Sequence, residues 1–412
     1  MAVFSGADLL LPKEDLVQKW AVVACDQYTS QPEYWENVEK YVGEAPSTLR
    51  TILPEARLQE DNGEQISRIH QTMEQYLKQD LWRKYPDSFV YVERTLHDGS
   101  VRRGVVGCID LEQYDYSDKS TAQIRATEKT VVERIPARKA IRQGAALDMS
   151  HIILLADDVE DLILGHLTAK KKHLTSVYDL DLMAEGGHIS GWLVEKEQAK
   201  DLREKINLYE QKMAGRGGSK ASMAYAVGDG NHSLAAAKAC YQKLRESKTA
   251  EELETNPLRY ALVELENIHH KEQEFEPIHR IVKISDPVRF LDKLQEDCCA
   301  QEGYPVKWYM DERSGCVYLD PKLGKSAVSI LQAFLDQNLE NMAQQLDYIH
   351  GEHVVQELAQ KEGHLGLALP PISKGDFFES LIVDGVLPRK TFSIGQAQEK
   401  RFYLETRSLT GK

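Results

Sequence analysis

The sequence of 412 residues carries 51 Lys and Arg against 65 Asp and Glu, a formal net charge of −14 at pH 7. A chain of this length can bury a hydrophobic core that is stable without disulfide bonds or a bound metal, and it can form more than one module. Its negative charge repels a phosphate backbone, so we expect no nucleic-acid partner. A local basic pocket for a small anionic ligand remains compatible with this total, because charges are screened over roughly 8 to 10 Å.

The cysteines and the apolar runs indicate the compartment. The six cysteines form no Cys-x-x-Cys pair, which favours free thiols in a reducing environment. The apolar residues near the N-terminus are interrupted by Asp8 and Lys13 and follow no basic segment, so no signal peptide is predicted. The apolar run 152–156 is far shorter than the roughly 20 residues that cross a bilayer. We therefore expect a cytoplasmic protein with no membrane partner.

The first part of the chain alternates strand and helix signals. Residues 14–25 end in an apolar run that is typical of a short buried strand, and Pro32 stands where a helix can begin. A helix is expected at 63–80, where apolar residues recur every three or four positions. Two apolar runs within 88–112 flank an Asp-Gly pair, which predicts an antiparallel hairpin.

The rest of the chain also contains both strand and helix signals. Apolar runs at 151–155 and 221–227 predict buried strands, and a turn and an alanine-rich helix follow the second. Further strands are expected at 258–265, 306–310 and 315–320. Further helices are expected at 285–297, 327–346 and 351–361. A last helix is expected to be capped by Asp376 and to end at Asp384. The pattern predicts an α/β (α+β) fold, a mixed sheet with flanking helices. We expect a core over 1–265 and a C-terminal α+β module over 266–412 packed on that core.

The turn at 228–233, Gly-Asp-Gly-Asn-His-Ser, is the strongest candidate for a binding site. The first turn of a helix exposes unpaired backbone N–H groups and the positive end of the helix dipole, so it binds anions. Gly228 and Gly230 would let the backbone approach a ligand, and Asp229 would hold a cation or accept a proton. Asn231, His232 and Ser233 would supply donors. The alternative is a plain Asp-Gly turn followed by an ordinary N-cap.

An arginine-rich segment, 125–142, is the second candidate. Its basic residues are Arg125, Arg134, Arg138 and Arg142. Guanidinium groups bind phosphate oxygens bidentately, so the segment could form a phosphate clamp. Glu128, if buried beside a substrate hydroxyl, would act as a general base. The alternative is a solvated helix face with Glu–Arg pairs. We expect this segment and Asp229 to face one cleft, because neither alone supplies both phosphate charge and a proton acceptor.

Three other patterns are weaker candidates. The cluster of His269, His270, Glu272, Glu274, Glu276 and His279 matches no standard metal-site spacing, and a polar connection explains it as well. Lys390 and Arg401 form a candidate pair for anion contacts, for which the alternative is a solvated surface. The glycine-rich stretch 213–220 lacks the spacing of a P-loop and is expected to be a plain loop.

Six ordered segments resemble the domain-of-unknown-function 1015 family: 25–35, 124–142, 151–158, 228–238, 275–282 and 385–407. The Asp-Gly-His-His-Arg motif usual in that family is similar to a turn of the ParB and sulfiredoxin superfamily, which includes nucleotide-dependent free-serine kinases. There the turn and the following helix bind phosphates, so the resemblance implies a ParB/sulfiredoxin-like core with a phosphate site at this turn. Asp229, Gly230 and His232 match the motif, whereas Asn231 and Ser233 replace a His and the Arg. Without that Arg, either the 125–142 segment supplies the positive charge or the ligand is not a nucleoside triphosphate.

The leading functional hypothesis is a phosphotransferase, a kinase that acts on a small hydroxylated metabolite such as a free amino acid, with ATP or ADP and Mg²⁺ as cofactors. Phosphoryl transfer needs mainly positioning and charge neutralisation, which an Arg cluster and a helix N-terminus provide. Glu128, Asp229 and His232 are the candidate catalytic residues, with Asp229 also holding the metal. The candidate nucleotide-binding residues are Gly228, Gly230, Asn231, Ser233, Arg125, Arg134, Arg138 and Arg142. The alternative is a non-catalytic sensor of nucleotides or metabolites on the same scaffold.

Overall fold

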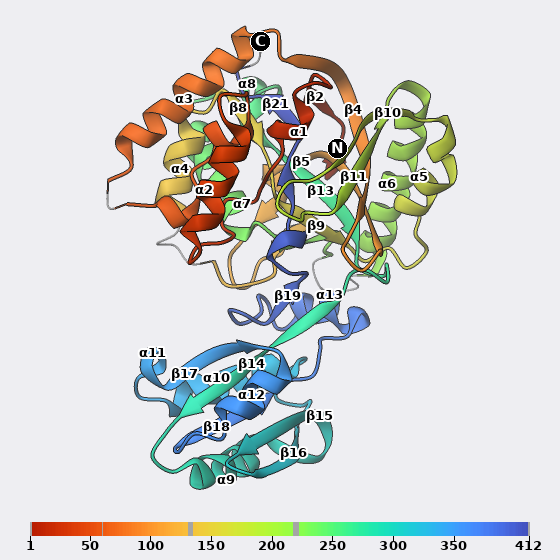
Figure 1. Ribbon diagram of the computed structural model, residues 1–412. Coiled ribbons are helices and arrows are strands. Elements are labelled where there is room, and N and C mark those ends of the chain that lie inside the picture. The colour runs from red at the N-terminus through yellow and green to blue at the C-terminus, as the bar shows by residue number, and fades with distance from the viewer. Residues whose placement is uncertain (1, 60, 131–134, 217–221, 411–412) are drawn as a thin grey trace.

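The computed structural model describes residues 2–59, 61–130, 135–216 and 222–410, which form a large lobe and a smaller lobe joined at a waist (Figure 1). The helices of the large lobe are α1 (Val17–Trp20), α2 (Pro32–Val42), α3 (Gly63–Lys78), α4 (Ile135–Gln143), α5 (Leu164–Lys170), α6 (Lys196–Arg216), α7 (Asn231–Arg245) and α8 (Ala250–Glu254). Within the described residues, no helix combines the length and the apolarity that crossing a membrane would require.

The large lobe is built on a mixed sheet. Its strands are β1 (Phe4–Ser5), β2 (Ala7–Pro12), β4 (Trp82–Thr95), β5 (Val101–Asp110), β6 (Tyr114–Asp115), β7 (Ile124–Ala126), β8 (Leu147–Met149), β9 (Ile153–Ala156), β10 (Thr175–Asp181), β11 (His188–Val194), β12 (Tyr225–Asp229), β13 (Tyr260–Asn267) and β21 (Thr406–Ser408). The pairs β6–β7, β7–β12 and β9–β13 are parallel, whereas β12–β9 and β4–β5 are antiparallel. The prediction of an α+β fold with a mixed sheet is confirmed.

Local sequence signals explain several elements. β4 and β5 form the expected hairpin, and Gly99 in its turn has φ +81°, a conformation that glycine adopts without strain. Helix α2 begins at Pro32, whose missing N–H costs nothing in the first turn. Helix α3 buries Ile69 and Met73 on one face, as its spacing predicts.

The helices cover both sides of the large lobe. Figure 1 shows α5 and α6 on one side, and α2, α3 and α4 on the other. Helix α7 packs against α4, and Ala235 and Ala236 join Ile135 in a small buried cluster between them. Small side chains on α7 therefore let these two helices lie close together.

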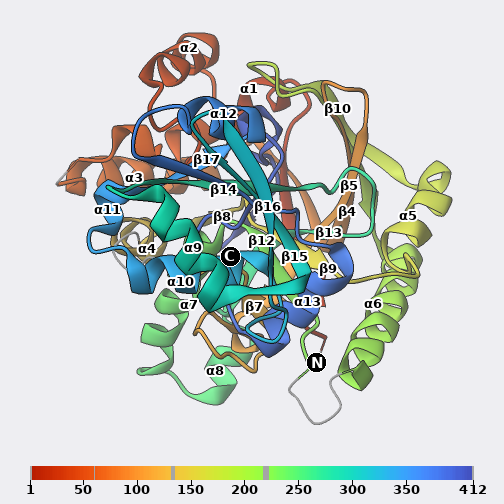
Figure 2. The same ribbon diagram turned by 90° about the horizontal axis from the view of Figure 1, so that it is seen from below.

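The smaller lobe has its own sheet and core. Its strands are β14 (Phe275–Lys283), β15 (Cys299–Met310), β16 (Arg313–Leu319), β17 (Leu346–His350) and β18 (His364–Ala368), with β19 (Phe392–Ile394) pairing with the start of β14. Its helices are α9 (Pro287–Cys298), α10 (Ala327–Asn338), α11 (Met342–Gln345) and α12 (Glu352–Leu358). A separate hydrophobic cluster that includes Leu331 and Leu367 fills the space between them. Figure 2, seen from below, shows this lobe in front of the large one.

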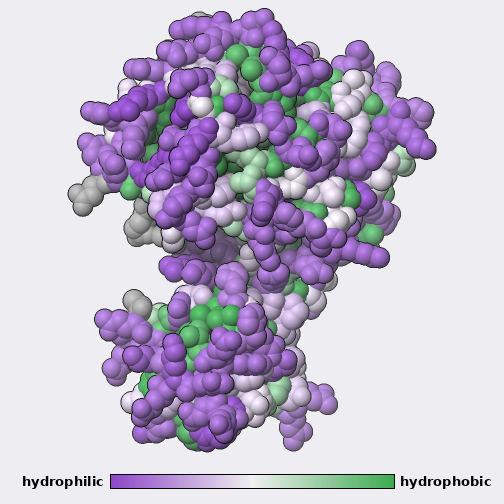
Figure 3. Space-filling model, in the orientation of Figure 1, coloured by the Kyte–Doolittle hydropathy of each residue, from purple (hydrophilic) through white to green (hydrophobic). Residues whose placement is uncertain are grey.

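Aromatic side chains pack the waist. The ring of Phe275 lies 4.8 Å from that of Phe377 on α13 (Lys374–Val383) and 4.9 Å from that of Phe392. These rings belong to the same buried cluster as the large sheet. The narrowing between the lobes, visible on the space-filling surface in Figure 3, is therefore a packed junction.

The end of the chain returns to the large lobe. β20 (Phe402–Tyr403) pairs with β3 (Val22–Val23), and β21 pairs with β2 and β8. Residues 402–408 thus complete the large lobe, although they fall within the stretch 266–412 that we expected to form the C-terminal module. These strands are short and become strands through pairing with distant partners.

Three local expectations need correction. The N-cap of α13 is Ser373, whose hydroxyl accepts from the backbone N–H of Asp376, so Asp376 lies in the first turn. The single helix expected at 327–346 is divided into α10 and α11. The strand expected from 221 begins at Tyr225. In each case the boundary is set by a cap or by tertiary pairing, which periodicity does not reveal.

Candidate functional site

The candidate turn lies where β12 ends and α7 begins. Gly230 precedes the helix with φ +79°, and a Cβ atom there would lie 3.0 Å from Ile152 Cγ1. Among the residues that the structure describes, no side chain caps this end of α7. Backbone N–H groups in the first turn of a helix without such a cap attract an anion. The plain N-cap that the sequence left open does not occur.

Asp229 lies at the end of β12 with both carboxylate oxygens in use. Its Oδ1 accepts from the backbone N–H of Gly230 at 2.8 Å, and its Oδ2 pairs with Lys400 Nζ at 3.3 Å. Both charged side chains are largely buried, with 18% and 14% of their surfaces exposed. At Gly228 a Cβ atom would lie 2.8 Å from Leu155 Cγ, so this glycine is required for packing.

The polar residues of the first turn face different neighbours. Asn231 Nδ2 donates to Thr127 Oγ1 at 3.3 Å, while its buried Oδ1 has no hydrogen-bond partner among the described residues. Ser233 Oγ lies 3.5 Å from His151 Nε2. His232 is half-buried beside them. An unsatisfied buried acceptor is costly, so Asn231 suits a ligand or ion that would donate to it or bind it.

Glu128 follows β7 and joins the two lobes. Its Oε1 accepts from the backbone N–H of Thr391 at 3.2 Å, and Leu387 N–H donates to the carbonyl of Thr127 at 2.8 Å. Burial raises the pKa of Glu128 to about 7, against the opposing effect of the backbone N–H groups of Thr391 and Lys390, and the charge of Asp229 raises it further. A carboxyl with this pKa exchanges a proton readily near neutral pH.

The arginine segment does not act as one clamp. Arg125 donates to the carbonyls of Ala122 at 2.9 Å and Ser222 at 3.2 Å, which precede the strands, so it lies away from the end of β12. Arg142 Nη1 donates to Asp148 Oδ1 at 2.6 Å. Arg138 forms an ion pair with Glu55. Arg134 lies outside the described residues.

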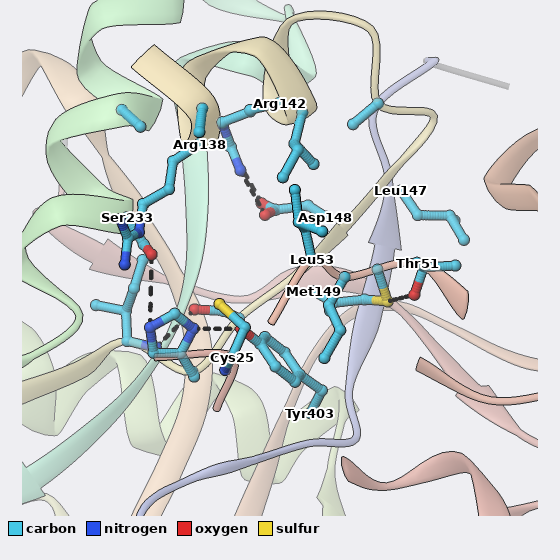
Figure 4. A pocket seen from close by; sticks show the side chains of 18 of the residues that line it. Cys25, Thr51, Leu53, Arg138, Arg142, Leu147, Asp148, Met149, Ser233 and Tyr403 are labelled. Atoms are coloured by element: carbon cyan, nitrogen blue, oxygen red, sulfur yellow. Dashed lines mark hydrogen bonds and ion pairs between the residues drawn. The ribbon is translucent and has the colours of Figure 1, made fainter. Parts of the chain in front are cut away.

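Arg138 nevertheless faces the same cavity as Ser233. This cavity, of about 120 Å³, lies between α4, α7, β8 and the segment 51–58. Figure 4 shows Arg138 and Ser233 on one side of it and Leu53 and Met149 across from them. Two arginines of the segment, Arg138 and Arg142, and the first turn of α7 thus line one cavity.

Four further residues were not identified as candidates from the sequence: Cys25, His151 and Tyr403, which line this cavity, and Asp26, which contacts His151. Tyr403 Oη lies 2.7 Å from His151 Nδ1, and Asp26 Oδ2 lies 3.8 Å from His151 Nε2. Burial alone would raise the pKa of Asp26, but the charge of His151 and of nearby cations holds it below its usual value. Burial raises the pKa of Cys25 to about 12, so this thiol stays protonated. The only sequence signal for them was their place within or beside the family-like segments.

Lys400 was also missed, and a buried arginine explains its position. Arg94 donates to the backbone carbonyls of Gln398 at 2.6 Å, Glu399 at 3.0 Å and Lys400 at 2.6 Å. These contacts fix the segment from which Lys400 reaches Asp229. The cation beside the turn is therefore held by a distant strand.

The weaker candidates have structural roles. His269 Nε2 lies 2.5 Å from Asp157 Oδ1 and His270 Nε2 lies 2.9 Å from Asp161 Oδ1, so each imidazole has a carboxylate partner. Within the part of the chain that the structure describes, no group of three or more His, Cys, Asp or Glu is placed to hold a metal ion. Arg401, for which a solvated surface was the alternative, is instead buried between Glu264 and Glu405.

Comparisons with known proteins identify relatives. The profile of the family described as protein of unknown function (DUF1015) matches residues 6–364. No curated protein matches the chain. Among solved structures, the chain is similar to SbnI with a C-terminal truncation from Staphylococcus aureus (11% identity, 73% of this chain and 82% of that one, TM-score 0.35). It is also similar to a free serine kinase in complex with AMP (12%, 74% and 90%, TM-score 0.35) and to a conserved hypothetical protein from Pyrococcus furiosus (10%, 74% and 95%, TM-score 0.33).

Proposed function

We propose that this chain, which belongs to the DUF1015 family, binds a nucleotide with Mg²⁺ and transfers a phosphoryl group to the hydroxyl of a small metabolite. The observation that carries the proposal is the meeting of an uncapped helix N-terminus with a carboxyl whose pKa lies near 7. Gly230 immediately precedes the first turn of α7. Glu128 lies close enough to Asp229 for the charge of Asp229 to raise the pKa of Glu128. An anion site beside a proton acceptor is what phosphoryl transfer requires.

The phosphates would be held by backbone N–H groups and by cations. The first turn of α7 provides the N–H groups, and Lys400 and Arg138 provide positive charge in place of the Arg that Ser233 replaces. Both cations are paired with carboxylates in the free protein. A phosphate that draws these cations away leaves the carboxylates of Asp229 and Glu55 without them, and the Mg²⁺ that accompanies the nucleotide would compensate the charge of Asp229.

The donor set at the turn fits a Mg²⁺ ion that arrives with a nucleotide. Mg²⁺ keeps several waters and usually takes one or two carboxylates together with phosphate oxygens. Asp229 provides one carboxylate, and the unsatisfied Oδ1 of Asn231 provides a neutral oxygen beside it. When bound, the ion would neutralise charge on the transferring phosphoryl group.

Glu128 would receive the proton that the acceptor hydroxyl loses. The hydroxyl oxygen forms a bond to the terminal phosphorus, the bond from that phosphorus to the bridging oxygen breaks, and the nucleotide leaves with one phosphate fewer. Above pH 7 the carboxyl of Glu128 is mostly ionised and ready to accept. His232, in the same turn, would donate to a phosphate oxygen.

A second function is favoured by the contacts of Glu128 with the other lobe. Its carboxylate accepts from Thr391, so a ligand that changed its charge or position would change the contact between the lobes. A nucleotide or metabolite sensor would use this connection without chemistry. The two functions differ in the effect they predict for Glu128→Gln: an enzyme keeps nucleotide binding and loses transfer, whereas a sensor has no transfer to lose.

The test measures binding and transfer separately. ATP, ADP, CTP and GTP with Mg²⁺ are titrated while the melting temperature is recorded, since a ligand at a hundredfold excess over its Kd adds roughly 2.7 kcal/mol to the free energy of unfolding. We expect at least one nucleotide to raise the melting temperature, and Lys400→Met to weaken that effect. Glu128→Gln should keep the melting shift but lose transfer to a panel of hydroxylated metabolites. If no nucleotide changes the melting temperature at millimolar concentration, the proposal is wrong.

A further inference from the structure

The cavity beside the candidate turn has two different ends. At one end lie Arg138, His151 and Ser233. The remaining wall is mostly apolar, and among its apolar residues lie the ion pair of Arg142 with Asp148 and the hydroxyl of Thr51. The apolar residues of this wall include Leu53, Leu58, Met73 and Met149. Figure 4 shows this division, with Ser233 and Arg138 facing Leu53 and Met149 across the space. A ligand that fits both ends has a charged or polar part joined to an apolar part.

The volume of the cavity and the chemistry of its apolar wall suit an aromatic ring system. At about 120 Å³ the cavity is roughly ten times the 10 to 15 Å³ that one water needs, which is room for on the order of ten non-hydrogen atoms, as in a purine. Two of its wall residues, Met73 and Met149, carry thioethers, which make favourable contacts with aromatic rings. Leu58 lies at the cavity with 41% of its surface exposed, although a leucine gains by burial.

The groups between the cavity and Glu128 indicate in which direction a bound ligand would extend. Asp26 contacts His151 at the cavity, and the charge of Lys400 also acts on Asp26. Lys400 in turn pairs with Asp229. Asp229 is the acidic neighbour of Glu128, and Glu128 does not line the cavity. The first turn of α7 connects the two places directly: Ser233 lines the cavity, and Asn231 donates to Thr127, the neighbour of Glu128 in the chain, at 3.3 Å.

We propose that this cavity binds the nucleobase of a purine nucleotide, whose phosphates then extend along the first turn of α7 towards Glu128. The inference rests on the proposed function and adds the placement of the base. Glu128 does not line the cavity, so the acceptor metabolite binds outside it.

A pair of alanines on α4 allows a matched test. Ala137 lines the cavity and is partly exposed, so Ala137→Leu fills the space while keeping a good helix former. Ala140 is exposed on the same helix and does not line the cavity, so Ala140→Leu is the control. Leu58→Ser changes the cavity at an exposed position and serves as a second variant if Ala137→Leu fails to fold.

The experiment compares ATP with inorganic tripolyphosphate, both with Mg²⁺, by titration calorimetry on the full chain. We expect wild type to bind ATP more tightly than tripolyphosphate, and Ala137→Leu to weaken ATP binding at least tenfold without changing tripolyphosphate binding. Ala140→Leu should change neither, and Leu58→Ser should weaken ATP alone.

Each other result overturns the inference in a recognisable way. If ATP binds Ala137→Leu as tightly as wild type, the base lies elsewhere and the proposed function stands. If Ala137→Leu weakens both ligands equally, the cavity holds phosphate. If wild type binds tripolyphosphate as tightly as ATP, no base site exists. If wild type binds neither, the proposed function fails together with the placement of the base.

Discussion

Replacing Glu128 by Gln should change how the stability of the protein depends on pH. Burial raises the pKa of this carboxyl from its ordinary value of 4.5 to about 7, so the folded state favours the protonated form. The stability that this preference gives is present below pH 4.5 and is lost as the pH rises through 7. The difference between 4.5 and about 7, at 1.36 kcal/mol per pH unit, corresponds to a loss of about 3 kcal/mol in the free energy of unfolding. This figure is an upper limit, because the half-buried side chain keeps some contact with water.

The measurement is the melting temperature of wild type and Glu128→Gln between pH 5 and pH 8. At about 2.1 cal/mol/K per residue, 412 residues give an unfolding entropy near 0.9 kcal/mol/K, so 3 kcal/mol corresponds to roughly 3 to 4 °C. The variant should gain up to that amount over wild type as the pH rises, since its amide can still accept from Thr391 and carries no charge. Burial also raises the pKa of Glu266 to about 7. Because Glu266 is present in both proteins, its titration does not change the difference between their melting temperatures.

The control for this comparison is Glu33→Gln, at an exposed position in the first turn of α2. Its difference from wild type should stay constant over the same pH range. If Glu128→Gln and wild type keep a constant difference from pH 5 to pH 8, the carboxyl of Glu128 is not destabilised by burial. The argument that it is a proton acceptor near neutral pH then fails as well.

Three further outcomes are expected. In an assay that detects transfer, the rate at saturating substrates should fall about tenfold per pH unit below pH 7 and level off above it, because only ionised Glu128 accepts a proton; a rate independent of pH from 5 to 7 would contradict this role. Gly230→Ala should lower the free energy of unfolding by about 1 to 2 kcal/mol in chemical denaturation, since its φ of +79° disfavours any side chain, and an unchanged midpoint would refute it. Arg401→Met should cost about 3 to 5 kcal/mol by the same measurement, because it leaves Glu264 and Glu405 buried without their cation; a loss below 1 kcal/mol would place that pair in contact with water.

The parts of the fold that could be predicted are those with local signals. The Asp-Gly turn of the β4–β5 hairpin, the proline that begins α2 and the apolar spacing of α3 each carry their own evidence. The hairpin β10–β11 and the long helix α6 were not expected. Helix α6 is rich in charge along its length, so apolar periodicity is weak there, although Leu202 and Ile206 are buried on it.

The candidate turn could be predicted for a similar reason. A strand, two glycines and an alanine-rich helix lie in one continuous stretch, and the structure places Gly230 and α7 as that stretch indicates. The arginine segment was less predictable, because the partner of each guanidinium is a distant residue. Asp148 holds Arg142 and Glu55 holds Arg138, and neither pairing has a local sequence signal.

Part of the positive charge at the site comes from the end of the chain. Ser233 stands where the family motif has an Arg, and Lys400, more than 160 positions later, lies beside the same turn. Lys400 is placed there because Arg94 binds the backbone carbonyls around it and because β20 pairs with β3 just beyond it. Tyr403, on β20, also orients His151 at the cavity. The strands that complete the large lobe therefore deliver the cation and orient the imidazole, so the candidate site forms only when the last segment of the chain has returned.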